Sequence, residues 1–286
     1  MNSPDSLVLR IEALVERLEG FFAHEKKEPD WDHIAYRWRK GAGLQPVLHP
    51  HRIILDDLLC IDRQKAEISR NTRQFVSGRS ANNVLLWGSR GTGKSSLIKA
   101  ILTEYADRGL RLIEVEKEDL IDLSDIVEQL FERPERFVLF CDDLSFEADD
   151  ASYKSLKAVL DGSIAAPPEN VLIYATSNRR HLLPEYRQEN LDTRVVQGEI
   201  HHGEGVEEKI SLSERFGLWL SFYPYSQEAY LRITDHWLEK LGASTTADGD
   251  IRTAALQWAL KRGSRSGRVA WQFARDQAGR MHTEAD

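Results

Sequence analysis

The chain has 286 residues, 41% of them hydrophobic, which suits a large domain accompanied by a smaller one. Its 46 acidic and 38 basic side chains leave a net charge of -8, which argues against a protein that coats nucleic acid through its overall charge. The two cysteines, Cys60 and Cys141, lie far apart and give little support to a disulfide scaffold or a zinc cluster. Without a segment of membrane-spanning length or a basic and apolar leader, the sequence predicts a cytoplasmic protein.

Residues 1–50 are predicted to form an N-terminal helical extension. Apolar side chains recur there at steps of four and three, which is typical of an amphipathic helix; they are Leu7, Ile11, Leu14, Leu18 and Phe21. This stripe either docks on the main domain, which we favour, or pairs with another subunit. Residues 31–40 mix aromatic and basic side chains, which favours a second amphipathic helix over a surface for a nucleic acid or an acidic partner. Residues 41–46 are interpreted as a linker.

The stretch 88–95 fits the pattern G-x-x-x-x-G-K-[ST] at every position. It follows the apolar run 84–86 and precedes residues 97–102, whose apolar side chains have helical spacing. Glycines at three positions permit backbone conformations in which successive N–H groups surround a phosphate. The pattern therefore predicts a strand, a phosphate-binding loop and a helix. The expected nucleotide contacts are Gly88, Ser89, Arg90, Gly91, Thr92, Gly93, Lys94, Ser95 and Ser96, the last of these being more typical of a plain helix residue.

Two side chains of this loop have distinct predicted roles. Lys94 meets the β- and γ-phosphates of ATP, and the hydroxyl of Ser95 binds Mg²⁺. The positive N-terminal end of the following helix points at the same anion. Upstream of the loop, Leu58 and Ile61 either cover the adenine ring or belong to the ordinary core, and the sequence does not decide between these two.

Further apolar runs at 110–115, 136–141 and 171–177 predict strands, and residues 120–131 have helical spacing. The run 136–141 ends in two carboxylates. We expect Asp142 to bind Mg²⁺ directly or through water, and Asp143 to orient or deprotonate the attacking water. Asn178 follows the next strand and is placed to bridge that water and the γ-phosphate. Alternating strands and helices predict a parallel sheet with its ligand at the carboxyl edge.

The later part of the chain holds two further candidate arginines. Residues 185–209 are polar and are interpreted as an exposed loop or hairpin. Arg215 precedes an apolar strand, from which it either reaches a phosphate or forms a surface ion pair. Beyond Pro224 the apolar spacing is helical only, which predicts a small helical domain, and Arg268 at the start of its last helix is expected to contact nucleotide across the cleft.

Taken together, these blocks resemble the AAA+ ATPases over about residues 50–280. Within that superfamily the chain is similar to a bacterial family of single-module ATPases catalogued as a domain of unknown function, and residues 140–146 and 212–222 carry the likeness. The resemblance implies an α/β P-loop domain at 51–225, with a parallel five-stranded sheet flanked by helices, and a helical lid at 226–286.

The resemblance also implies a role for each matching residue. Lys94 and Ser95 correspond to Walker A, Asp142 and Asp143 to Walker B, Asn178 to sensor 1 and Arg268 to sensor 2. Arg215 stands in a Ser-x-Arg-Phe-Gly setting similar to the arginine finger of Holliday-junction branch-migration motors. This similarity implies a homo-oligomer in which Arg215 acts on nucleotide bound to the neighbouring subunit.

Three functions compete on these residues. The first is Mg²⁺-dependent ATP hydrolysis that remodels an unidentified macromolecular partner. The second is a slow-turnover switch or loader that binds a partner in the ATP state, since Asp143 replaces the usual glutamate and reaches about one carbon less far. The third is a small-molecule kinase, which the helical lid, Asn178 and Arg215 disfavour.

Overall fold

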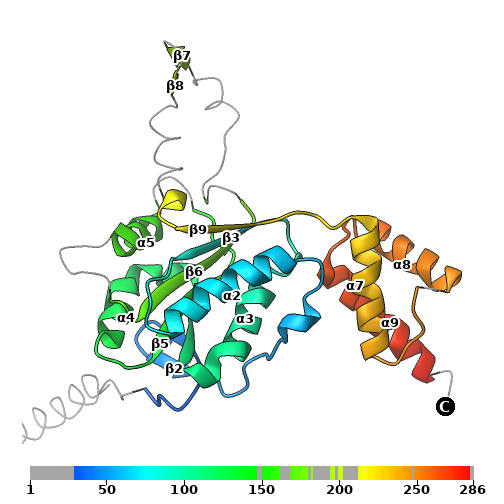
Figure 1. Ribbon diagram of the computed structural model, residues 1–286, viewed down its shortest axis with the longest axis horizontal. Coiled ribbons are helices and arrows are strands. Elements are labelled where there is room, and N and C mark those ends of the chain that lie inside the picture. The colour runs from blue at the N-terminus through cyan, green and yellow to red at the C-terminus, as the bar shows by residue number, and fades with distance from the viewer. Residues whose placement is uncertain are drawn as a thin grey trace, which may run out of the picture.

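The protein is built on a central β-sheet (Figure 1). The computed structural model describes residues 29–146, 150–161, 168–179, 182, 194–196, 199–201, 212–246 and 248–283. Within these residues, seven strands form one sheet in the order β2-β1-β4-β5-β6-β3-β9. The strands are β1 (Ala35–Arg39), β2 (Gly43–Pro46), β3 (Val84–Gly88), β4 (Leu110–Glu114), β5 (Arg136–Cys141), β6 (Val171–Ser177) and β9 (Leu218–Phe222).

The five strands predicted between residues 84 and 222 are all present, and they run parallel as neighbours in the order β4-β5-β6-β3-β9. The phosphate-loop strand β3 therefore lies between β6 and β9. Its end is in register with the ends of both neighbours, since Trp87 pairs with Ser177 and Gly88 pairs with Phe222. Parallel strands bring their carboxyl ends to one edge, so the residues that follow β3, β5 and β6 meet there.

The sheet has seven strands, and the prediction of five was wrong because residues 35–46 belong to the sheet. Strand β1 runs parallel to β4, and β2 turns back antiparallel to β1. Residues 31–40 therefore contain strand β1 and the residues that lead into it, and the expected helix is wrong. Residues 41–46, which we expected to be a linker, form a turn followed by strand β2. Tyr36 and Trp38 alternate into the core, and Gly41 (φ 79°) makes the turn.

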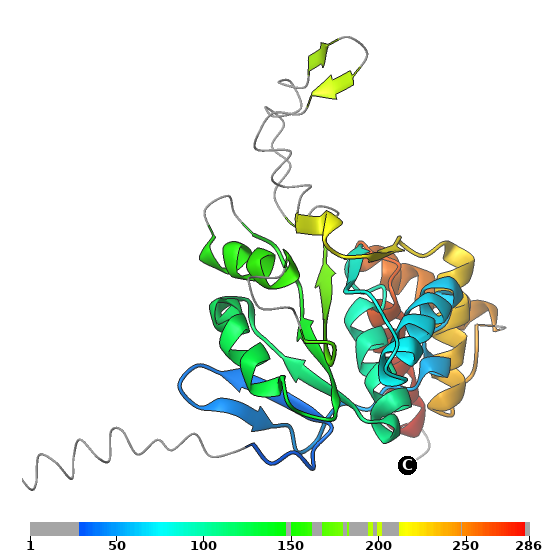
Figure 2. The same cartoon turned by 60° about the vertical axis from the view of Figure 1, so that its left-hand side comes forward.

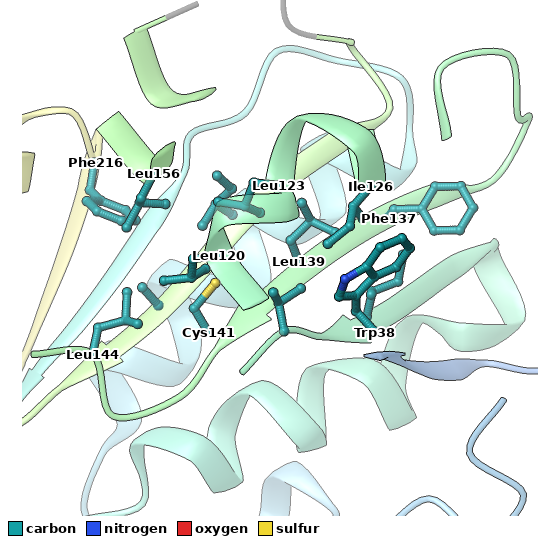
Figure 3. Close-up of a cluster of buried hydrophobic side chains, with 14 of the residues drawn as sticks. Trp38, Leu120, Leu123, Ile126, Phe137, Leu139, Cys141, Leu144, Leu156 and Phe216 are labelled. Carbon is teal, nitrogen blue, oxygen red and sulfur yellow. The ribbon is translucent and has the colours of Figure 1, made fainter. Parts of the chain in front are cut away.

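Helices cover both faces of the sheet. The longer ones are α2 (Asp62–Val76), α3 (Lys94–Tyr105), α4 (Leu123–Leu130) and α5 (Ala151–Asp161), and the short 3₁₀ helices are η1 (Leu55–Asp57), η2 (Ala106–Arg108) and η3 (Lys117–Asp122). Helices α2 and α3 bury Ile68, Leu97 and Ile101 against one face. Helices α4 and α5 cover the other face, where Trp38, Leu123 and Leu156 belong to one cluster (Figure 3). Helix α5 was not predicted from the sequence.

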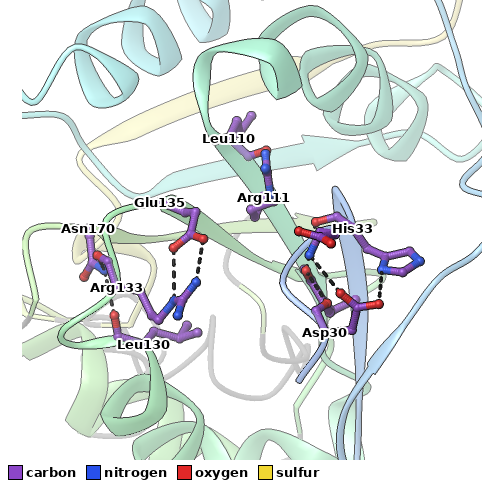
Figure 4. Close-up of polar contacts among 10 residues, drawn as sticks. Asp30, His33, Leu110, Arg111, Leu130, Arg133, Glu135 and Asn170 are labelled. Atoms are coloured by element: carbon purple, nitrogen blue, oxygen red, sulfur yellow. Dashed lines mark hydrogen bonds and ion pairs between the residues drawn. The ribbon is translucent and has the colours of Figure 1, made fainter. Parts of the chain in front are cut away.

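The amino ends of the strands, at the edge opposite the phosphate loop, are held by polar contacts (Figure 4). Asn170, just before β6, donates its amide N–H to the carbonyl of Leu130, at 2.7 Å. Arg133 and Glu135, which precede β5, form an ion pair with an Nη2–Oε1 distance of 2.7 Å. These contacts satisfy polar groups in the loops that enter the sheet, so we assign this edge a structural role.

Beyond Pro224 the described residues form the helices α7 (Gln227–Lys240), α8 (Gly249–Lys261) and α9 (Gly267–Thr283), as expected from their spacing. They pack on a core of their own, which includes Tyr230, Ala255 and Phe273. Figures 1 and 2 show them as a group beside the sheet, and we call this group the lid. The side chain of Ser226 caps α7 by accepting the N–H of Ala229 at 3.1 Å.

The remaining sequence predictions concern segments of which little is described. The amphipathic helix expected over residues 7–21 lies outside the described residues. Within the polar segment 185–209, β7 (Arg194–Val196) and β8 (Glu199–His201) pair antiparallel, which agrees with the hairpin alternative. Among the helices that the structure describes, none has the length and apolar character needed to cross a membrane.

Candidate functional site

The phosphate loop leaves β3 under tight steric limits. Gly88 has φ 128°, and a Cβ there would lie 1.9 Å from the carbonyl oxygen of Phe222. The N–H of Ser89 donates to that same carbonyl at 2.9 Å. Gly93, with φ 98°, then begins helix α3. Only glycine adopts these positive φ angles without strain, so the loop has the curvature of a cradle for a phosphate group.

Lys94 lies inside this loop and is only 7% exposed. Its ammonium group donates to the carbonyls of Gly88 at 2.7 Å and Ser89 at 2.8 Å, and to Oδ1 of Asn178 at 3.2 Å. Burial lowers the pKa of Lys94, while the carboxylates of Asp143 and Asp142 act in the opposite direction. The cation is thus fixed among oxygen atoms at the carboxyl edge of the sheet.

A cluster of oxygen atoms lies beside Lys94. Oδ1 of Asp142 accepts hydrogen bonds from Oγ of Ser95 at 2.6 Å and from Oγ1 of Thr176 at 2.5 Å. Thr176 in turn accepts the N–H of Asp143 at 2.8 Å. Carboxylate and hydroxyl oxygens are the ligands that Mg²⁺ prefers, so the donor set at Ser95 and Asp142 fits this ion.

Asp143 and Asn178 contact each other at the same edge. The side-chain N–H of Asn178 donates to Oδ1 of Asp143, while its own oxygen accepts from Lys94. Asp143 has φ 51°, a left-handed conformation that aspartate tolerates better than most residues. The amide of Asn178 therefore links the exposed carboxylate to the buried ammonium group.

A cavity of about 830 Å³ opens at these groups and extends between the sheet and the lid. Its walls contain most of the residues predicted to bind nucleotide or metal, which are Leu58, Ile61, Arg90, Gly91, Thr92, Gly93, Lys94, Ser95, Ser96, Asp142, Asp143, Asn178 and Arg268. Ile61 belongs to the core and Leu58 packs against it, although both also line the cavity. The structure therefore agrees with both alternatives, a cover for the adenine ring and a place in the ordinary core. Gly88 and Ser89 do not line the cavity, and their carbonyl oxygens accept hydrogen bonds from Lys94.

The lid contributes the apolar side chains of Ile233, Trp237 and Trp271 to the cavity, and we call this part of the lining the aromatic end. Asp57, in η1 of the α/β domain, pairs with His236 at 3.1 Å and with Lys240, both on α7. These contacts join the α/β domain to the lid. The cavity therefore has a charged end at the phosphate loop and an aromatic end at the lid, a distribution that matches a triphosphate joined to a planar base.

Arg215 is not brought to this cavity within the chain. Its side chain forms an ion pair with Asp161, the last residue of α5. This is the second of the two alternatives considered for Arg215. Arg215 lies in the turn before β9, whereas the phosphate loop follows the carboxyl end of β3. Arg215 therefore lies towards the other edge of the sheet from the phosphate loop of its own chain.

Sequence reasoning missed several residues of the site, among them the apolar residues of the lid named above, Thr176 and Tyr225. Thr176 belongs to a run of hydroxyl residues at the end of β6 that we noted without assigning a role. Tyr225, which lines the cavity and donates its hydroxyl to the carbonyl of Thr92 at 2.7 Å, has no motif around it. The roles assigned to the other site residues stay predictions, since the geometry places the groups and does not test their chemistry.

Comparison with known proteins gives a family and a fold. The model of the family described as "Protein of unknown function (DUF815)" matches residues 31–281. No curated protein matches the chain.

Solved structures similar to this one include several AAA+ proteins. A point variant of Thermotoga maritima RuvB is 18% identical with a TM-score of 0.51, over 78% of this chain and 64% of that one. A replication initiator DnaA, bound to AMPPCP and single-stranded DNA, is 16% identical with a TM-score of 0.53, over 80% and 65%. The chain spans less than two thirds of the length of either protein. This likeness shows the AAA+ fold, with seven strands in the sheet described above.

Proposed function

The chain belongs to the family described as "Protein of unknown function (DUF815)", and from the geometry of its site we propose that it binds ATP with Mg²⁺ and hydrolyses it. One observation carries this proposal. Lys94, Ser95, Asp142 and Asn178 come from three separate strand ends and converge at the charged end of one cavity.

We infer that the triphosphate lies along the phosphate loop. The glycines at 91 and 93 leave room for it, and Lys94 turns its ammonium group from the loop carbonyls towards the β- and γ-phosphates. Mg²⁺ held by Ser95 and Asp142 neutralises phosphate charge. The base then occupies the aromatic end of the cavity, beside Trp237.

We further infer that Asp143 receives the proton of the attacking water. Its carboxylate is exposed at the cavity, and Asn178 holds one of its oxygens in place. The proton leaves the water as its oxygen bonds to the γ-phosphorus, while the bond from that phosphorus to the bridging oxygen of ADP breaks. Asn178, which contacts both Asp143 and Lys94, orients the same water.

The proposal includes a homo-oligomer in which Arg215 of one copy reaches the γ-phosphate bound to the next. Its absence from the cavity of its own chain supports this arrangement. The partner that the assembly acts on is a macromolecule of unidentified kind. A similar fold occurs in a DnaA bound to single-stranded DNA, so DNA is the first partner to test.

Phosphate release measured over a range of protein concentrations tests the proposal. We expect turnover per subunit to rise with concentration, and to be lost in Lys94→Ala. Mixing Lys94→Ala with Arg215→Ala should restore part of the turnover, because a mixed assembly contains interfaces that pair an intact phosphate loop with an intact arginine. Turnover that is independent of concentration and unaffected by Arg215→Ala would rule out the action between subunits.

A second candidate function is the slow-turnover switch. It is favoured by Asp143, whose short side chain and contact with Asn178 hold the carboxylate close to the sheet. Such a protein binds ATP tightly and releases little phosphate, even when it is assembled. Single-turnover hydrolysis, compared with the rate of nucleotide exchange, separates the two functions.

A further inference from the structure

Tyr225 lies in the short connection between β9 and α7, where the body of the protein continues into the lid. Pro224 precedes it and Ser226, which caps α7, follows it. The side chain of Tyr225 packs against the core beneath the sheet and also against the core of the lid. This residue thus touches both parts of the protein at the point where they join.

The hydroxyl of Tyr225 reaches the phosphate loop. It donates to the carbonyl oxygen of Thr92 at 2.7 Å, one residue before Gly93 and two before Lys94. Burial raises the pKa of Tyr225, so the hydroxyl keeps its proton and remains a donor at neutral pH. The donor cannot be lost by ordinary changes of pH.

The same stretch of the phosphate loop touches the lid directly. The N–H of Arg268, at the start of α9, lies 3.4 Å from the carbonyl oxygen of Gly91. A Cβ on Gly91 would approach Oγ of Ser266 to 2.8 Å, which shows how closely the loop and the lid pack. Any movement of residues 91–92 on phosphate binding therefore acts on the lid at two places, at Tyr225 before α7 and at Arg268 at the start of α9.

We propose that Tyr225 is a positioning residue that couples the phosphate loop to the lid. Its hydroxyl holds the carbonyl of Thr92 while its ring is held by the lid core, so the loop and the lid shift together. This proposal rests on the proposed binding of ATP. Through this coupling, Tyr225 brings Arg268 and Trp271 towards a bound nucleotide. Tyr225 itself does not contact the phosphates.

Tyr225→Phe tests the coupling because it removes only the hydroxyl and keeps the ring in place. The matched control is Tyr230→Phe, since the hydroxyl of Tyr230 also donates to a backbone carbonyl, that of Ala255 at 3.1 Å, but entirely within the lid. Hydrogen exchange of the full chain is followed with and without Mg²⁺-ATP, at the phosphate loop and in α7 and α9 separately.

We expect wild type and Tyr230→Phe to show ATP-dependent protection at both places. In Tyr225→Phe the phosphate loop should still be protected, while the protection of α7 and α9 falls by at least threefold. Thermal stability without nucleotide should change similarly in the two variants.

Two results would overturn the proposal in distinguishable ways. Full ATP-dependent protection of the lid in Tyr225→Phe would show that the lid follows the nucleotide without the hydroxyl, while ATP binding itself stands. Absence of protection at the phosphate loop in wild type, at millimolar ATP, would refute ATP binding and the coupling that rests on it.

Discussion

Thr176→Val removes the hydroxyl that joins the carboxylate of Asp142 to the backbone N–H of Asp143, and leaves the shape of the side chain nearly unchanged. In the wild type this hydroxyl donates to Oδ1 of Asp142 at 2.5 Å and accepts the N–H of Asp143 at 2.8 Å. Thr176 is 1% exposed, so water does not easily replace either bond. The variant therefore loses one bond to a charged acceptor and leaves one backbone donor without its partner.

The expected effects follow from these two losses. A bond to a charged group contributes about 1.5–3 kcal/mol, and groups that orient a metal ligand typically alter metal affinity about 10- to 100-fold when they are removed. We therefore expect the Mg²⁺ concentration needed for half-maximal ATP binding to rise about 10- to 100-fold. Calorimetric titrations with ATP at a series of Mg²⁺ concentrations measure this shift.

A matched variant separates the metal site from general destabilisation. Thr234→Val removes an equally buried hydroxyl, which donates to the carbonyl of Tyr230 at 2.8 Å inside the lid. It should lower the free energy of unfolding by about 1 kcal/mol and leave the Mg²⁺ dependence unchanged. If folded Thr176→Val required no more Mg²⁺ than Thr234→Val, the role assigned to Thr176 in holding Asp142 would be wrong.

Three further predictions concern the loop, the base and the arginine. Gly88→Ala should lower the free energy of unfolding, measured in urea, by more than about 3 kcal/mol, because its Cβ would meet backbone atoms. Gly109→Ala, at a position with φ 87° and open space, should lower it by about 1–2 kcal/mol. Equal losses would refute the steric argument. Asp143→Asn should preserve ATP affinity and slow phosphate release at least about 100-fold, and an unchanged rate would exclude Asp143 as the base. Asp161→Asn should lower turnover of concentrated protein several-fold, because Arg215 loses the carboxylate that orients it. The same variant should not alter ATP binding by dilute protein. Unaffected turnover would mean that Asp161 does not orient Arg215 for catalysis.

The parallel core could be predicted because buried strands give continuous apolar runs that end in polar residues. Strand β1 carries a different pattern. Its outward side chains Arg37 and Arg39 pair with glutamates, and its inward Tyr36 and Trp38 are aromatic, so basic and aromatic residues alternate. This alternation has the two-residue period of a strand. We interpreted the composition as that of an amphipathic helix and gave too little weight to the period.

The site was predictable where a motif fixes both residue type and spacing, as at Lys94 and Asp142. Tyr225 could not be predicted in this way, because its function depends on a contact with Thr92 that is 133 residues away in sequence. The separation of Arg215 from the cavity also depends on the order of the strands. A resemblance supplied the expectation of a second copy, and the structure adds that Arg215 does not line the cavity of its own chain.

Equilibrium binding of Mg²⁺-ATP, followed by calorimetry on the full chain, tests the central claim most directly. We predict one site per subunit, with an affinity that falls at least about 100-fold in Lys94→Ala and when Mg²⁺ is removed. Correctly folded wild-type protein that gives no binding signal with adenine nucleotides at millimolar concentration would contradict the account.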